Sequence, residues 1–495
     1  MRRILPIFLV LFFITLITKG QNKIEILHAD DLIFNNKIHP EYGKLIGNVS
    51  FKLEGTLMTC DSAYHYKSNK IDAFGSIIIN KGDTLWLYGE KLNLNENTRK
   101  AVISKNVKLI DKHTILTTEL ITYDINAGIA NYPFKGKITD EKNNLVSNSG
   151  NYNTKSHIFY FKGDIELTNN EYLMQTDTML YNSKSNISFF HGPTSIKSDN
   201  NIIYCEDGWY DSKNNTSQFQ KNGSINNKNF SLSGDSLFYD RNIGYGRAIS
   251  NVFLIDTTNN LFITGKIAEY FEDSEKAVVT NNPLLNIITY DDTLFISADT
   301  MMSTKVDIKR EIVAYNNVKC FKNNLQAISD SLSYNTKDST IELFYQPIIW
   351  SNKYQITSDS IKIQLNNGEI SKMFLRSNPM IISQEDSINF NQIKGKVMYG
   401  FFKNNNLHKI SVIGGGQTIF LAKNSENKNI GINTSECSDI TLIFKDNLID
   451  VISFHNQPTA IFHPLNKVKE EKRKLNGFIW RENDRPKGKF DLFNE

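Results

Sequence analysis

Acidic residues recur along this 495-residue chain in a pattern that could bring oxygen ligands together. A small residue stands directly before each of them and an apolar residue stands two positions after it, as in Gly234-Asp235-Ser236-Leu237. Only one such carboxylate occurs in about 30 residues, whereas a calcium site needs six or more oxygen ligands in one place. We therefore expect no metal site and interpret these residues as structural corners: Asp30, Asp61, Asp177, Asp235, Asp299, Asp330 and Asp359.

Other residues with catalytic potential lack the spacing that known chemistry requires. Gly414-Gly415-Gly416 is followed by Gln417-Thr418 and not by the Lys-Ser/Thr pair of a phosphate-binding loop. The nine histidines form no HExxH motif, and the nucleophile motif GxSxG is absent. We expect no catalytic residue, no cofactor and no enzymatic activity. The cysteines lie too many repeats apart for disulfides and should be free thiols: Cys60, Cys205, Cys320 and Cys437.

The elements that would position the corners form an internal repeat. A six-residue phrase, apolar-any-small-Asp-any-apolar, recurs in thirteen more or less exact copies at a mean spacing of about 30 residues. Its last position is apolar in every copy. This apolar column comprises Leu32, Ala63, Leu92, Ile121, Tyr152, Met179, Trp209, Leu237, Ala268, Met301, Leu332, Ile361 and Met398.

Each repeat predicts two β-strands that are joined by a polar turn such as Lys67-Ser68-Asn69-Lys70. Apolar residues five apart, such as Leu232 and Leu237, would face opposite sides of a flat strand, so the small-Asp pair must bend the strand or add a bulge. A Gly or Pro in the second strand, as at Gly75, would be the matching corner. The sequence thus predicts an all-β fold, an elongated stack of folded antiparallel strands of the β-jellyroll or β-taco-like solenoid type.

The two ends of the chain differ from the repeat. Residues 1–20 combine two arginines with a short apolar run, Ile4 to Ile17, which is typical of a cleaved signal peptide and predicts export. The repeats occupy residues 21–425, about thirteen units in one stack or two sub-stacks. Residues 426–464 are a degenerate final β unit, and residues 465–495 are a tail that starts with a short charged helix. The formal net charge of +3 is too small to indicate a nucleic-acid partner.

The repeated phrase resembles that of the OstA/LptA-like lipopolysaccharide-transport proteins. The match is clearest in Leu232 to Tyr239 and in Ala327 to Tyr334, where the phrase ends in a tyrosine. Gly477-Phe478-Ile479-Trp480 and Arg485-Pro486 are similar to the ending of the long OstA-like proteins of Bacteroidota-type Gram-negative bacteria. Thirteen units exceed those of the short bridge protein of this family, and the C-terminal outer-membrane barrel of the translocon subunit is missing.

The resemblance implies a periplasmic protein, free or associated with the outer membrane, that carries the lipid A acyl chains of lipopolysaccharide in an apolar β-groove toward the outer membrane. The apolar column would line that groove. Implied partners are lipopolysaccharide, the inner- and outer-membrane components of its transport, and further copies of the chain, paired head to tail through edge strands. The alternative is a structural or adhesive envelope solenoid with a closed core that binds proteins. The tail after Pro464 is either a cap on an edge strand or a docking peptide.

Overall fold

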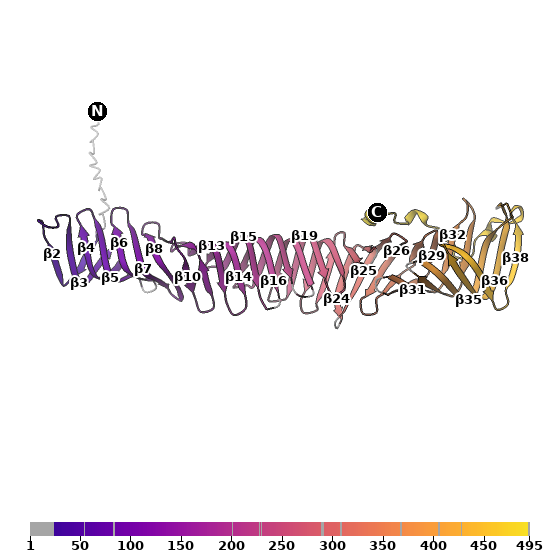
Figure 1. Ribbon diagram of the computed structural model, residues 1–495, viewed down its shortest axis with the longest axis horizontal. Coiled ribbons are helices and arrows are strands. Elements are labelled where there is room, and N and C mark those ends of the chain that lie inside the picture. Colours follow the sequence, from indigo (N-terminus) through magenta and orange to yellow (C-terminus); the bar gives the residue numbers. More distant parts are fainter. Residues whose placement is uncertain are drawn as a thin grey trace, which may run out of the picture. The chain divides into compact units, whose positions relative to one another are not determined.

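A computed structural model describes residues 24–53, 55–82, 85–199, 201–226, 228, 230–288, 292–306, 309–366, 369–403, 406–426 and 428–493. The chain divides into two compact units, Met1–Lys184 (unit 1) and Ser185–Glu495 (unit 2). Both units consist almost entirely of antiparallel β-strands (Figure 1), which confirms the predicted all-β fold class. The expected signal peptide, residues 1–20, lies outside the described residues.

Unit 1 is built from strands of 4 to 12 residues. They are β1 (Glu25–His28), β2 (Asp31–Phe34), β3 (Tyr42–Leu53), β4 (Thr56–Tyr66), β5 (Lys70–Lys81), β6 (Leu85–Asn95), β7 (Lys100–Asp111), β8 (Thr114–Asp124), β9 (Ile129–Tyr132), β10 (Gly136–Thr139), β11 (Asn144–Ser147), β12 (Ser149–Asn153), β13 (Ile158–Thr168) and β14 (Leu173–Asn182).

The strands of unit 1 pair in sequence order, and the short strands are halves of a long one. Strands β3 to β8 form consecutive antiparallel pairs. Both β1 and β2 pair with β3, with Asp30 between them, and both β9 and β10 pair with β8. A repeat of the sequence therefore corresponds to two strands, each of which has a corner near its middle.

Unit 2 continues the same pattern of long strands and paired half-strands. Its strands are β15 (Ile187–Lys197), β16 (Ile202–Asp211), β17 (Thr216–Asn226), β18 (Phe230–Asp240), β19 (Tyr245–Asp256), β20 (Leu261–Phe271), β21 (Lys276–Thr280), β22 (Leu284–Ile288), β23 (Thr293–Ser297), β24 (Thr300–Val306), β25 (Lys309–Lys322), β26 (Leu325–Asn335), β27 (Thr340–Phe344), β28 (Ile348–Ser351), β29 (Tyr354–Thr357), β30 (Ser360–Asn366), β31 (Glu369–Arg376), β32 (Met380–Gln384), β33 (Phe390–Lys394), β34 (Val397–Lys403), β35 (Asn406–Lys423), β36 (Asn429–Lys445), β37 (Leu448–His455) and β38 (Thr459–Pro464).

The tail of unit 2 forms short 3₁₀ turns instead of the expected charged α-helix. These are η1 (Leu465–Lys467), η2 (Glu470–Arg473), η3 (Glu482–Asp484) and η4 (Lys489–Phe493). None of the side chains of η1 and η2 is buried, so no apolar face is available to stabilise a longer helix there.

Candidate functional site

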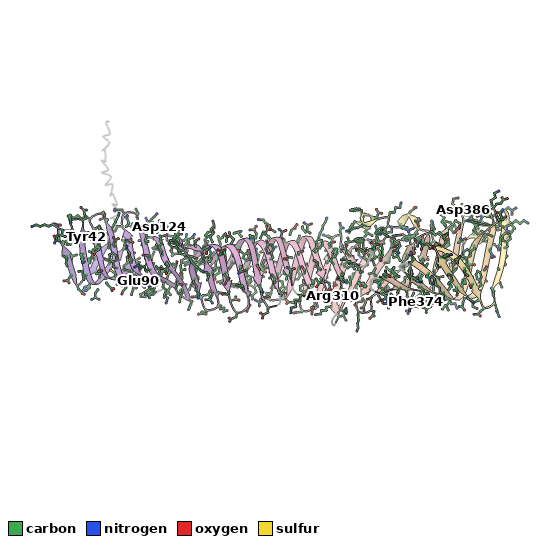
Figure 2. All side chains as sticks on the ribbon, viewed as in Figure 1. Tyr42, Glu90, Asp124, Arg310, Phe374 and Asp386 are labelled. Carbon is green, nitrogen blue, oxygen red and sulfur yellow. The ribbon has the colours of Figure 1, made fainter. Side chains whose placement is uncertain are left out.

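In about every second long strand, the corner is a pair of residues in the left-handed backbone region. In β7 these are Lys105 and Asn106, with φ angles of 67° and 52°. The two residues lie opposite a single residue, Glu119, of β8, where the strand register shifts. The Asn106 side chain donates a hydrogen bond to Glu90 on the other neighbouring strand, at 2.5 Å (Figure 2 labels Glu90). The strand folds back at such a bulge because the extra residue breaks the pleat.

The acidic residues of the repeat lie at these corners. Asp30, Asp61, Asp235, Asp299 and Asp359 each accept a hydrogen bond from the second left-handed residue of a neighbouring strand: Asn48, Ser76, Asn251, Asn317 and Asn378, at 2.9–3.2 Å. Asp177 and Asp330 instead accept from the next residue of their own strand, Thr178 at 3.1 Å and Ser331 at 2.6 Å.

Glycine at the first left-handed position gives the carboxylate room. A Cβ atom added to Gly75, whose φ is 73°, would lie 2.1 Å from Oδ2 of Asp61. The left-handed backbone and the close approach of the carboxylate both favour glycine there. The acidic residue and the glycine of the repeat are thus two parts of one corner.

Within each unit, most members of the apolar column lie in a buried row beside the corners. In unit 1, side-by-side partners in adjacent strands run through Leu32, Leu45, Ala63, Ala73, Leu92, Ile103 and Ile121. Ala63, Leu92, Ile121 and Met179 are at most 2 % exposed, and in unit 2 Leu237, Ala268, Met301, Leu332, Ile361 and Met398 are at most 1 % exposed. Leu32 is 55 % exposed because it lies on β2, which pairs on one side only among the described strands.

Two members of the apolar column were misplaced by one or two residues in the sequence interpretation. The corner of β16 is Glu206, to which Asn222 donates a hydrogen bond, so Gly208 occupies the row and Trp209 lies on the outer face beside Phe189 and Gln218. The corner of the earlier repeat is Asn148, which places Gly150 in the row and Tyr152 beyond it.

Glycine replaces an apolar side chain at both of these positions because an aromatic ring from a paired, earlier strand fills the space. A Cβ added to Gly208 would lie 2.4 Å from the Phe190 ring, and a Cβ added to Gly150 would lie 2.3 Å from the Tyr132 hydroxyl. A sequence pattern that requires an apolar side chain at this position therefore selects Trp209 and Tyr152 instead of the two glycines.

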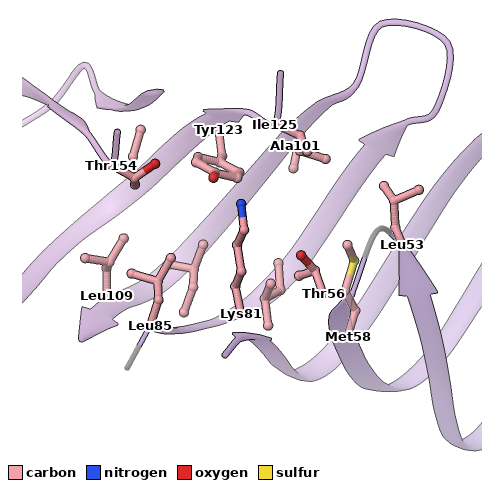
Figure 3. A pocket seen from close by; sticks show the side chains of 13 residues that line it. Leu53, Thr56, Met58, Lys81, Leu85, Ala101, Leu109, Tyr123, Ile125 and Thr154 are labelled. Atoms are coloured by element: carbon pink, nitrogen blue, oxygen red, sulfur yellow. The ribbon is translucent and has the colours of Figure 1, made fainter. Parts of the chain in front are cut away.

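An apolar cavity opens in unit 1 on the side away from the corners. It has about 600 Å³ of space between its lining atoms, part of which is open to solvent. Ala101 and Leu109, near the two ends of the folded strand β7, both line it, so the cavity lies between the two halves of the folded strands. Its remaining lining residues are Leu53, Thr56, Met58, Ile79, Lys81, Leu85, Leu87, Tyr123, Ile125, Ala130 and Thr154 (Figure 3).

Two polar groups stand in this apolar surface. The Tyr123 hydroxyl is buried and has no hydrogen-bond partner among the described residues. Figure 3 shows the Lys81 side chain extending across the cavity in the direction of Tyr123. Lys81 is exposed, and the described part of unit 1 supplies no acidic side chain within ion-pair distance of its ammonium group.

The cavity is suited to a molecule with an apolar chain and a polar or anionic group. Mostly apolar walls with a few polar groups are typical of small-molecule sites. The Tyr123 hydroxyl can donate to a carbonyl or hydroxyl oxygen of a ligand, and the Lys81 ammonium can pair with a carboxylate or phosphate.

None of the thirteen residues of the apolar column lines the cavity. They pack beside the corners, whereas the lining residues lie near the strand ends. A search could have found the lining residues as the outermost apolar positions of each strand, such as Leu53 and Leu109. Their distance to the corner varies between strands, so no column appears in the sequence.

The remaining reactive groups are protected by burial. The described residues include no group of three or more His, Cys, Asp or Glu side chains that could hold a metal ion. All four cysteines are free thiols. Burial is the main cause that raises the pKa of Cys60, Cys205 and Cys320 to about 12.

Comparisons with known proteins agree with the repeat. Residues 21–177 match the family model described as OstA-like protein, which confirms the resemblance for that part of the chain. No curated protein matches the chain. Among solved structures, the chain is similar to the crystal structure of LptH from Pseudomonas aeruginosa, which is described as the LptA homologous periplasmic component of the conserved lipopolysaccharide transport device. That match has 12 % sequence identity and a TM-score of 0.21, and covers 23 % of this chain and 81 % of LptH.

Proposed function

We propose that unit 1 is a lipid carrier that binds an acyl chain of lipopolysaccharide in its apolar cavity. The observation that carries the proposal is that the cavity lies between the two ends of folded strands and is lined mainly by aliphatic side chains. All of its lining residues, from Leu53 to Thr154, fall within the part of the chain that matches OstA-like proteins. Each methylene group that leaves water contributes about 0.8 kcal/mol, so no covalent chemistry is needed to hold the ligand.

The polar groups of the cavity support an amphiphilic ligand over a purely apolar one. An unpartnered buried hydroxyl such as that of Tyr123 costs about 1–3 kcal/mol, and a ligand oxygen would remove that cost. Lys81 would pair with an anionic group of the same ligand, such as a phosphate of lipid A. The cavity would then hold the lipid at the junction between its chain and its head group.

The proposal extends to the place of the protein in the envelope. Among the described residues, no helix has the length and apolar character needed to cross a membrane. A cleaved signal peptide at residues 1–20 would deliver the chain to the periplasm, where it would act, free or associated with the outer membrane, as a bridge between inner- and outer-membrane transport components. The described end strands could pair with such partners or with further copies, because β38 pairs only with β36 and exposes Ile461 and Phe462 by 59 % and 50 %.

Unit 2 favours the alternative, a closed core, for its own part of the chain. Met301, Leu332 and Met398 have 0 % exposure, so a ligand could reach them only if the strands separated. We therefore propose that the lipid is held in unit 1 and that the core of unit 2 has a structural role.

A binding experiment tests this assignment. A fluorescent acyl probe should bind the purified chain and be displaced by lipopolysaccharide. Leu109→Asp should abolish binding because it places a charge in the cavity, whereas Lys108→Asp, on the opposite face of the same strand, should bind as the wild type does. Equal binding by both variants would contradict the proposed site.

A further inference from the structure

The C-terminal segment Arg473–Phe493, here called the strap, covers the outer face of a half-sheet in unit 2. Figure 1 shows the yellow C-terminal segment returning from β38 to a position beside β26. Its hydrogen bonds follow the same course, because Arg473 and Leu475 contact Gln392 of β33, and Leu492 contacts Ser297 of β23. The strap therefore crosses the strands of the half-sheet instead of pairing with one of them.

The surface beneath the strap is a row of cross-strand neighbours, here called the outer row: Phe295, Phe321, Gln326, Trp350, Gln355, Ile382, Gln392 and Ile419. Trp350, Gln355, Ile382 and Gln392 have 0 % exposure. Outward-facing cross-strand neighbours in unit 1, such as Lys108, Thr117 and Lys137, are exposed. The strap thus buries a face that would otherwise be in water.

Two glutamines of the outer row bind the strap through its backbone. The Gln355 amide donates to the carbonyl oxygen of Ile479 at 2.6 Å and accepts from the N–H of Arg481 at 2.8 Å. Gln392 does the same with the carbonyl of Arg473 at 2.7 Å and the N–H of Leu475 at 2.8 Å. Each side-chain amide therefore supplies the donor and the acceptor that a neighbouring strand would otherwise provide. An extended chain needs such partners because its backbone N–H and C=O groups must form hydrogen bonds.

A few side chains of the strap contact the rest of unit 2 and would make binding selective for this sequence. Phe478 and Trp480 both pack against Phe390, with ring centroids 5.1 and 5.3 Å apart. Further along, Nε of Arg485 donates to Oε1 of Gln326 at 2.8 Å. This combination of backbone hydrogen bonds with spaced side-chain anchors is how proteins recognise extended peptides.

The strap also has features of a ligand that can leave. It is tethered through η1 and η2, in which no side chain is buried. The Nε1–H group of Trp350 is buried beneath it and has no hydrogen-bond partner among the described residues, which lowers the stability of the strapped state. The outer row therefore retains one unsatisfied donor when its own strap is bound.

We propose that the outer row is a peptide-binding site for an extended segment of the type Phe-x-Trp with an arginine five residues after the tryptophan, and that the strap is an exchangeable occupant that a second copy of this chain can also supply. Exchange of straps would link two copies through the outer face of unit 2. This inference is independent of the lipid proposed for unit 1, because no residue of the outer row lines the unit 1 cavity.

The test uses the full chain, with a protease site inserted into the exposed link at residues 467–471 and cleaved after purification. The cut strap should remain bound during gel filtration, and a fluorescein-labelled peptide of residues 472–495 should exchange into the complex, as followed by anisotropy. The Trp480→Ala peptide should bind about tenfold more weakly, because it lacks an aromatic anchor. A scrambled peptide should not bind.

Chain variants provide the second arm. Gln355→Leu with Gln392→Leu should weaken retention of the cut strap about tenfold or more, since four backbone hydrogen bonds are lost. Gln175→Leu, on an exposed position of unit 1, should retain the strap as the wild type does. A cut strap that dissociates and does not rebind, a cut strap that never exchanges with the labelled peptide, or peptides that bind without regard to Trp480 would each overturn the proposal.

Discussion

The side-chain amide of Asn251 donates to both carboxylate oxygens of Asp235, at 3.2 and 3.0 Å, across the corner where β18 and β19 bend. Asn251 has a φ of 48°, so its side chain reaches the carboxylate from a left-handed backbone. The same pairing of an acid with a left-handed residue recurs at other corners in both units, for example between Asp61 and Ser76 in unit 1. The acidic residue and the left-handed residue of the neighbouring strand therefore form the corner together, joined by a hydrogen bond.

The corner predicts a measurable coupling between Asp235 and Asn251. Asp235→Ala should destabilise the surrounding strands by about 1–3 kcal/mol, because it removes the acceptor of the Asn251 amide. Asn251→Gly also removes the bond but suits the left-handed backbone, so it should cost less than Asn251→Ala. Hydrogen exchange of β18 and β19 measures both effects, and additive effects in the double variant would show that the two residues do not interact.

Charge in the closed core of unit 2 should be strongly destabilising. Leu332 has 0 % exposure, so Leu332→Asp would bury an unpaired carboxylate and should cost several kcal/mol. Ser331→Asp, one residue earlier on the outward-facing side of β26, is the matched control. Chemical denaturation followed by tryptophan fluorescence compares the two variants. A loss of stability no larger than that of the control would show that the interior of unit 2 is open to water.

The sequence predicted the fold better than the site, for a physical reason. Strand alternation and corner residues such as Asp235 and Gly75 are local requirements, which recur in every repeat and leave a visible pattern. The cavity depends on how the strand ends pack against one another, as at Leu109 and Tyr123, and this is decided by contacts between distant segments. The position of the strap could not be predicted from the sequence either, because Gln355 and Gln392 are polar residues whose burial depends on a segment more than 80 residues away.

Lys81 should determine the preference for anionic ligands. Lys81→Glu should weaken binding of dodecyl phosphate about three- to tenfold, because an attractive charge becomes repulsive at a largely exposed position. Binding of the uncharged dodecyl maltoside should change little. Titration calorimetry of both detergents at low salt measures this difference, and an equal loss for both would assign Lys81 a role in packing alone.

Thiol labelling should follow burial. A pKa of about 12 leaves about one in ten thousand Cys60, Cys205 or Cys320 thiols ionised at pH 8 in the folded chain. Cys437 is only half-buried and should react first with N-ethylmaleimide, followed by mass spectrometry of the peptides. The rates should rise with pH, because only the thiolate reacts. Labelling of Cys320 as fast as Cys437 in the native chain would contradict the closed core around β25.

Photo-crosslinking in living cells tests the lipid assignment most directly. A photoreactive amino acid at Leu109 or Met58, which line the unit 1 cavity, should capture lipopolysaccharide. The same amino acid at Lys108 on the outer face, or at Leu332 in the closed core of unit 2, should capture little or none. Strong labelling confined to Leu109 and Met58 is the predicted result. Equal labelling at all four positions, or none at the two cavity positions, would contradict the proposal that unit 1 carries the acyl chain.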